Sequence, residues 1–123
     1  NAFGIKSVIL TEGCADIYNP KTIRASMGAI FKETVYKMDF NTIYDLKQKG
    51  IKFIGATKNI DSIDVKKADL TNVIVVLGNE GQGISNELLE LCDEMIRIPI
   101  SSNCESLNAA IAASIIMWEA RKE

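Results

Sequence analysis

The sequence has no histidine, and this absence removes several kinds of chemistry at once. Zinc sites with histidine ligands, Ser-His-Asp triads and acid–base catalysis by imidazole all need that side chain, and we expect no metal site. Cysteine is scarce as well: Cys14, Cys92 and Cys104 are odd in number and form no CxxC pair. Free thiols in a reducing compartment are the simplest interpretation.

Long apolar runs and a strong net charge are also lacking. The longest uncharged stretch near the end, residues 106–118, is too short to span a bilayer, and no signal peptide is visible, so we expect a cytoplasmic protein. The formal net charge of −2 gives no global sign of nucleic-acid binding, although a local basic patch is enough for phosphate contacts. The chain begins with Asn1, which favours a fragment of a longer protein.

What is present suits one soluble domain. The 123 residues are 47% hydrophobic and 24% charged, enough to bury a core without disulfides. Apolar runs predict strands in residues 6–10, 34–37, 51–56, 73–77 and 95–100. Helical periodicity and capping residues predict helices in residues 20–31, 40–49, 85–92 and 106–121, with a polar loop containing a helical turn in residues 57–71. This alternation predicts an α/β fold with a mainly parallel sheet and helices on both faces.

A glycine-rich loop, residues 78–83, follows the strongest predicted strand. Its order is GxxGxG, which is neither the dinucleotide fingerprint nor a P-loop. Glycines let the main chain turn tightly and approach a ligand closely. An ordinary strand-to-helix turn explains the spacing equally well.

Two further segments carry candidate polar groups. Ser106 opens the last predicted helix as an N-cap, with Asn108 in its first turn, where exposed N–H groups could also hold an anion. Near the start, Lys21 and Arg24 lie three residues apart and share one helix face, for which a solvated cationic surface is the plainer interpretation. Gly28 inside that predicted helix costs stability, which a close backbone approach would explain.

The last predicted helix is apolar nearly all round. Leu107, Ile111, Ile115 and Trp118 form one stripe, and alanines with Ile116 and Met117 cover most of the rest. Such a helix must be buried on nearly every side. We expect one face to pack on the sheet and another on a second copy of the chain; a plain core helix is the alternative.

Together these segments resemble the SpoU family of RNA methyltransferases, also called TrmH-like, within the SPOUT class. The stretches NPKTIRASMGAIF, VIVVLGNEGQGIS and IRIPISSNCESLNAAIAASIIMWE occur in the family's order and spacing and, with their surroundings, cover nearly the whole chain. The resemblance implies transfer of a methyl group from S-adenosylmethionine to a ribose 2′-hydroxyl of rRNA or tRNA. It also implies a deep C-terminal trefoil knot, a rare exception to unknotted chain connections. The expectation of a homodimer comes from the apolar last helix.

In such a fold the knotted loops form the cofactor site. Mapped onto this sequence, the residues implied to bind S-adenosylmethionine are Thr57, Leu77, Gly78, Gly83, Ile98, Ile100 and Leu107. Main-chain groups at Gly78, Ile98 and Leu107 would hold the cofactor, and the side chains of Leu77 and Ile100 would flank the adenine.

The resemblance further implies an active site with Glu80, Ser106 and Asn108, and RNA contacts from Lys21 and Arg24. Ser106 and Asn108 would position the RNA phosphate or ribose, and Glu80 would organise its loop and a partner arginine. The family's first motif, with the arginine assigned to activating the hydroxyl, precedes a segment like residues 1–4 and is not in this sequence. We therefore expect residues 1–123 to be a methyltransferase domain without that motif or an upstream RNA-binding domain, able to bind cofactor but weak or inactive in catalysis.

Two other functions compete with this one. A non-catalytic knotted module for RNA binding or assembly would keep the fold and lack the upstream arginine in the full-length protein. A nucleotide-binding domain of flavodoxin-like type would have no knot, and the glycine order argues against it.

Overall fold

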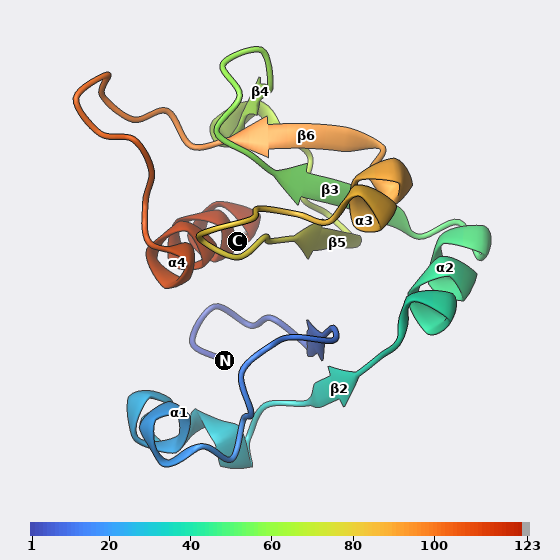
Figure 1. The fold of residues 1–123 in the computed structure, drawn as a ribbon, viewed down its shortest axis with the longest axis vertical. Coiled ribbons are helices and arrows are strands. Elements are labelled where there is room, and N and C mark those ends of the chain that lie inside the picture. Colours follow the sequence, from blue (N-terminus) through green and yellow to red (C-terminus); the bar gives the residue numbers. More distant parts are fainter. Residues whose placement is uncertain (122–123) are drawn as a thin grey trace. The chain divides into compact units, whose positions relative to one another are not determined.

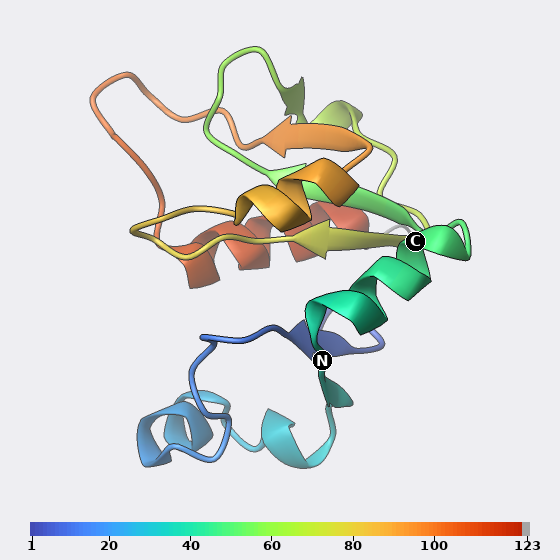
Figure 2. The same cartoon turned by 45° about the vertical axis from the view of Figure 1, so that its right-hand side comes forward.

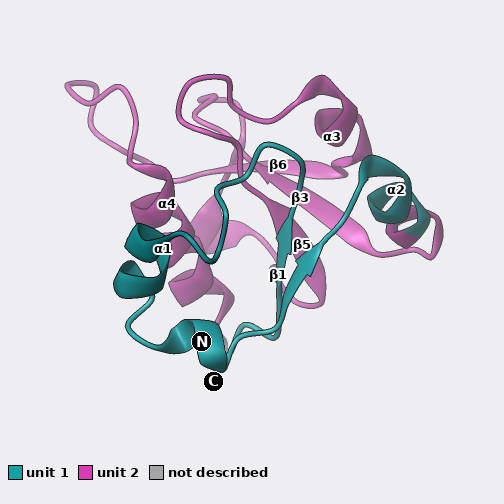
Figure 3. Ribbon diagram, turned by 60° about the horizontal axis from the view of Figure 1, so that its bottom comes forward, with its two compact units in different colours: residues 1–45 teal, residues 46–123 magenta. Residues whose placement is uncertain are grey.

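A computed structural model describes residues 1–121 of the chain. The chain divides into two compact units, residues 1–45 and residues 46–123 (Figure 3). Residues 122 and 123, the last two of the predicted domain, lie outside the described residues. Each unit is built around its own parallel strands, so the predicted α/β class with parallel pairing is confirmed.

The first unit contains one pair of parallel strands. Strand β1 (Val8–Leu10) pairs with β2 (Val35–Lys37), with Val8 opposite Val35. Between them lie helix α1 (Pro20–Ala25) and the 3-10 helix η1 (Ala29–Phe31). Helix α2 (Phe40–Gln48) follows β2, and its last residues belong to the second unit (Figure 3). Both predicted strands and the second predicted helix are confirmed.

The prediction of one continuous helix over residues 20–31 is wrong. Asn19 caps α1 as expected, accepting a hydrogen bond from the Lys21 N–H, but the helix ends at Ala25. Met27 and Gly28 then adopt left-handed conformations, with φ of 49° and 83°, which no α-helix accommodates. Gly28 is therefore a turn residue rather than a helix-interior one, and the large apolar side chains of Met27 and Phe31 beside it are exposed.

The second unit holds a four-stranded, fully parallel sheet with the order β4-β6-β3-β5. Its elements, in chain order, are β3 (Lys52–Ala56), β4 (Ile63–Asp64), the 3-10 helix η2 (Val65–Lys67), β5 (Val73–Val76), α3 (Asn86–Leu91), β6 (Glu94–Arg97) and α4 (Ala109–Ala120). Strand β3 lies between β5 and β6, which are formed later in the chain (Figure 1). The carboxyl ends of these three strands therefore meet at one edge of the sheet.

The core of the second unit lies between the sheet and α4. Ile54 and Ile96, both with 0% exposure, pack with Val65 of η2, Leu70 and Ile116 of α4. Side chains alternate along a strand, so Gly55 and Met95 face the other side of the sheet, where Cys92 at the end of α3 approaches Gly55. Helices thus cover both faces of this sheet, as predicted, with α4 on one side and α3 on the other (Figure 2).

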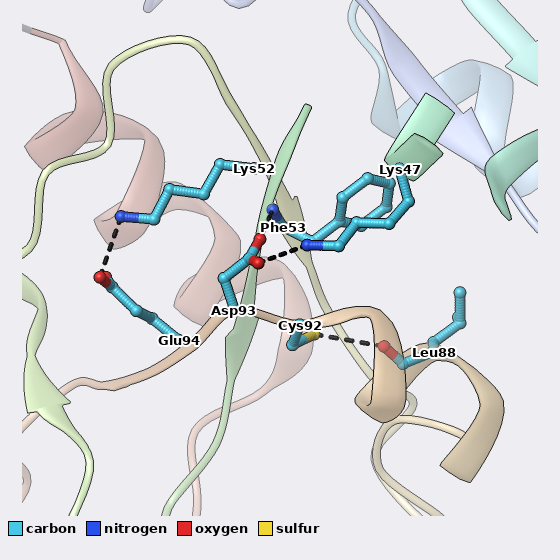
Figure 4. Close-up of polar contacts among 7 residues, drawn as sticks. All are labelled: Lys47, Lys52, Phe53, Leu88, Cys92, Asp93 and Glu94. Carbon is cyan, nitrogen blue, oxygen red and sulfur yellow. Dashed lines mark hydrogen bonds and ion pairs between the residues drawn. The ribbon is translucent and has the colours of Figure 1, made fainter. Parts of the chain in front are cut away.

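Asp93 fixes the pairing of β3 with β6 at its start (Figure 4). Its N–H donates to the Phe53 carbonyl oxygen at 2.8 Å, and its Oδ2 accepts from the Phe53 N–H at 2.9 Å. Its Oδ1 accepts a charge-assisted hydrogen bond from Lys47 Nζ, near the end of α2. A second ion pair, between Lys52 and Glu94, joins the same two strands at 3.0 Å.

Two boundaries in the second unit differ from prediction by three residues, and one strand was not predicted. The last strand covers Glu94–Arg97, so residues 98–100 belong to the following loop. The last helix begins at Ala109 and is capped by Asn108, not by Ser106. Strand β4 was not predicted, although η2 is the expected helical turn in the polar segment. Within residues 1–121, every helix is too short or too polar to cross a membrane.

Candidate ligand-binding site

Three loops at the carboxyl edge of the sheet enclose a pocket of about 440 Å³. They follow β3, β5 and β6, the strands whose ends the sheet order brings together. In open parallel sheets, ligands bind in this position, where neighbouring connections leave in opposite directions. The volume lies in the range of small-molecule sites. All residues that line the pocket belong to the second unit.

Every residue predicted to bind the cofactor lines this one pocket. The loop after β3 contributes Thr57, the loop after β5 contributes Leu77, Gly78 and Gly83, and the loop after β6 contributes Ile98, Ile100 and Leu107. Glu80 and Ser106, predicted for the active site, line it too. Residues that are 20 to 50 positions apart in the sequence are thus brought to the same cavity.

Gly78 is the tightest point of the pocket wall. A Cβ atom added there would collide with main-chain atoms of Gly83 and Ile84, coming within 2.5 Å of the Gly83 carbonyl oxygen. Backbone atoms cannot move aside as the end of a flexible side chain can. By contrast, the nearest atom to a Cβ on Gly81 would be 3.8 Å away. Only glycine fits at position 78, whereas position 81 has room for alanine.

Hydrogen bonds within the glycine-rich loop hold it closed. Asn79 and Gly83 exchange two backbone hydrogen bonds, of 3.2 and 3.0 Å. The Asn79 Oδ1 atom accepts from the N–H groups of Gly81 at 3.0 Å and Gln82 at 2.6 Å. The loop is therefore preorganised by its own hydrogen bonds. The sequence analysis did not predict a role for Asn79, although an asparagine between Gly78 and Gly81 is typical of a turn.

Glu80 and Asn108, two of the predicted active-site residues, are in direct contact. Asn108 Nδ2 donates to Glu80 Oε1 at 2.7 Å, and the Ala109 N–H donates to the same oxygen at 3.3 Å. Asn108 Oδ1 meanwhile accepts from the N–H groups of Ala110 and Ile111. A carboxylate beside a helix N-terminus is favourable, because the unpaired N–H groups there carry partial positive charge. The glycine-rich loop is thus tied to the start of α4.

The contact between Glu80 and Asn108 does not include Ser106, Lys21 or Arg24, the other residues predicted for the active site and for RNA. Ser106 lies on the pocket wall, two residues before the helix cap, and its carbonyl oxygen accepts from the Cys104 thiol at 3.4 Å. Lys21 and Arg24 lie on α1 in the first unit, and both are exposed, as expected for residues on one accessible helix face.

Lys58 is a pocket residue that sequence reasoning missed. It directly follows Thr57 in the loop after β3 and is exposed. Among the described residues that line the pocket it is the single cation, and Glu80 is the single anion. The sequence could have indicated Lys58 as a pocket residue, because it stands next to Thr57, which was predicted to bind the cofactor.

The pocket suits a ligand with a flat apolar part and polar edges. Leu77, Ile98, Ile100 and Leu107 provide apolar surface, and the turns provide main-chain N–H and C=O groups. Such sites fix orientation with a few polar groups placed on mostly apolar walls.

Comparison with known proteins finds similarity to one family and to its members. The SpoU rRNA Methylase family matches residues 1–118. The chain is 32% identical over 122 residues to a 23S rRNA (guanosine(2553)-2′-O)-methyltransferase of Bacillus subtilis, covering 98% of this chain and 49% of that protein. The chain thus spans about half the length of the curated relatives it matches.

Solved structures share the fold. The AdoMet-bound rRNA methyltransferase of Sinorhizobium meliloti superposes with a TM-score of 0.89 and 28% identity, over 98% of this chain and 47% of that one. The SpoU methyltransferase AviRb of Streptomyces viridochromogenes, in complex with AdoMet, superposes with a TM-score of 0.85 and 32% identity. The match covers 97% of this chain and 50% of that one.

Proposed function

The chain belongs to the SpoU rRNA methylase family, and we propose that it carries the cofactor-binding part of an RNA 2′-O-ribose methyltransferase. The reaction would move a methyl group from S-adenosylmethionine to a ribose 2′-hydroxyl of rRNA or tRNA. The Bacillus subtilis relative named above is a 23S rRNA 2′-O-methyltransferase, and the two structural neighbours named above hold AdoMet.

One observation carries the proposal: seven residues implied by the family motifs, from three separate loops, line one pocket. An unrelated strand-to-helix turn after β5 would not require the loops after β3 and β6 to converge on it. The collision that any side chain at Gly78 would cause adds a second reason, since a main-chain wall can lie close to a ligand.

The pocket fits S-adenosylmethionine in size and chemistry. Main-chain groups of Gly78, Ile98 and Leu107 would hold the adenosine, and Leu77 and Ile100 would flank its ring. When bound, the cofactor supplies a methyl group that its sulfonium already makes electrophilic. The protein's task is therefore to orient the two reactants and to help remove the hydroxyl proton.

Glu80, Ser106 and Asn108 would serve the RNA side of the site. Glu80 accepts hydrogen bonds from Asn108 and from the start of α4, so its role would be to keep the glycine-rich loop against that helix. Ser106, on the pocket wall, would position a ribose or phosphate oxygen. Asn108, which contacts the pocket residue Glu80, would do so with the remaining N–H of its side-chain amide. Correct positioning can lower a reaction barrier by several kcal/mol.

The proposal includes three further features: a trefoil knot, a dimer and contacts with RNA. Helix α4 would be threaded through a loop to make a deep C-terminal trefoil knot, and the knotted crossings would form the cofactor pocket. A second copy of the chain would cover α4, where Ile111 is 54% exposed although the helix is almost wholly apolar. Lys21 and Arg24 of α1 would contact RNA phosphates.

The experiment that tests the function compares RNA from cells with and without the full-length protein. Mass spectrometry of nucleosides from purified rRNA and tRNA should show one 2′-O-methylnucleoside that is lost in the deletion strain and restored by the gene. Unchanged levels of every 2′-O-methylnucleoside in both RNA classes would contradict the proposal.

A further inference from the structure

Lys58 is a charge in the pocket that nothing in the described protein balances. The ion pairs of the described chain join other residues: the N-terminus with Glu33, Lys47 with Asp93, and Lys52 with Glu94. Glu80, the anion of the same pocket, is instead hydrogen-bonded to Asn108 and Ala109. The lysine is exposed on the pocket wall, so its side chain is available to a ligand there.

The chemistry of the ligand gives this cation a partner. S-adenosylmethionine carries an α-carboxylate on its amino-acid end, and that carboxylate would share a 440 Å³ pocket with the carboxylate of Glu80. Like charges in one site repel, and a nearby ammonium group offsets that repulsion. The other polar side chains of the pocket, Thr57, Asn79, Gln82 and Ser106, are uncharged, which leaves Lys58 as the side chain whose charge suits the task.

On the basis of the proposed function, we propose that the Lys58 ammonium binds the α-carboxylate of the cofactor's amino-acid end. Lys58 follows Thr57, a pocket residue already expected to bind the cofactor, so it lies on the wall that the bound molecule contacts. The carboxylate belongs to the same molecule whose adenosine fills the pocket. An RNA phosphate, by comparison, would have to be brought in by a second ligand.

Calorimetric titration with two nucleosides tests this assignment. S-adenosylhomocysteine has the amino-acid end, whereas 5′-methylthioadenosine lacks it and keeps the adenosine. Lys58→Met should weaken binding of S-adenosylhomocysteine by about two- to fivefold, the range for an exposed charged pair, and leave binding of 5′-methylthioadenosine unchanged. Lys58→Arg should retain the affinity of the unmodified protein, because it keeps the charge.

Lys66→Met is the matched control, since Lys66 is an exposed lysine of η2 outside the pocket. It should change neither affinity. The assignment is overturned if Lys58→Met weakens both nucleosides equally or neither, or if it weakens only the binding of a short RNA. If the unmodified protein binds neither nucleoside, the proposed function itself fails, and that result is distinct from a failure of Lys58 alone.

Discussion

At the residue scale, Asp93 joins three elements through a single side chain and its own N–H. The pKa of its carboxyl is lowered, mainly by the hydrogen bond from Lys47 and then by the one from the Phe53 N–H. A carboxyl group with a lowered pKa in the folded state stabilises that state only while it is ionised. Asp93 therefore makes the stability of the second unit depend on pH in the acid range.

The sign of this dependence follows from the two pKa values. The stabilisation is fully present above the unfolded value of about 3.9 and is lost as pH falls through the lower folded value. Asp93→Asn should therefore lower the free energy of unfolding by roughly 1 kcal/mol at pH 6, a hydrogen-bond contribution reduced by solvent exposure, and by much less at pH 2 to 3. Urea denaturation of both proteins at each pH measures the difference. An equal loss at pH 6 and at pH 2 to 3 would rule out the charged contact with Lys47.

At the element scale, the start of α4 connects stability with the site. Asn108 caps the helix and also donates to Glu80, whereas Ser106 does neither. Asn108→Ala should destabilise the protein by about 1 kcal/mol, the usual cost of losing an N-cap, and should also loosen the glycine-rich loop. Chemical denaturation measures the first effect.

Ser106→Ala is the matched control for this helix cap. It should change the stability by less than about 0.5 kcal/mol, as substitutions on the surface usually do. If Ser106→Ala cost as much as Asn108→Ala, the helix would begin earlier than the structure has it.

The same scale shows where sequence reasoning succeeds. Strand Val73–Val76 and residues 53–56 of the strand Lys52–Ala56 are continuous apolar runs, and burial on both faces of a parallel sheet makes such runs easy to recognise. Strand β4 was missed because it has only two residues, Ile63 and Asp64, in a polar segment. Its pairing with β6 depends on tertiary contact, which no local pattern carries.

The predicted end of the first helix and the predicted start of the last helix were both wrong. The apolar spacing of Ile23, Met27 and Phe31 continues past Ala25, but the left-handed conformation of Met27 ends the helix. Ser106 and Asn108 are both good caps, and the contact of Asn108 with Glu80, 28 residues away, distinguishes them. The residues that the resemblance implies for the cofactor all line one pocket, because a family pattern reflects such long-range contacts, yet the resemblance passed over Lys58, which lines the same pocket.

At the scale of the whole molecule, α4 indicates how copies of the chain would associate. Ile111 exposes 54% of its surface on a helix that is apolar nearly all round. If a second copy covers it, light scattering at micromolar concentration should give the mass of a dimer, and Ile111→Arg should give a monomer, because an unpaired charge in an apolar interface is costly. Ile60→Arg, at a more exposed isoleucine (78%) outside α4, should remain a dimer. A monomer in the unmodified protein would contradict the proposed dimer.

The central claim is that the turns after β3, β5 and β6 bind S-adenosylmethionine through a main-chain wall at Gly78. Isothermal titration of the unmodified protein, Gly78→Ala and Gly81→Ala tests it most directly, since an added methyl group collides at position 78 and has room at position 81. We expect micromolar affinity for the unmodified protein and for Gly81→Ala, and a loss of about tenfold or more for Gly78→Ala, equivalent to about 1.4 kcal/mol. No heat of binding from the folded, unmodified protein, or equal affinity in all three, would contradict the claim.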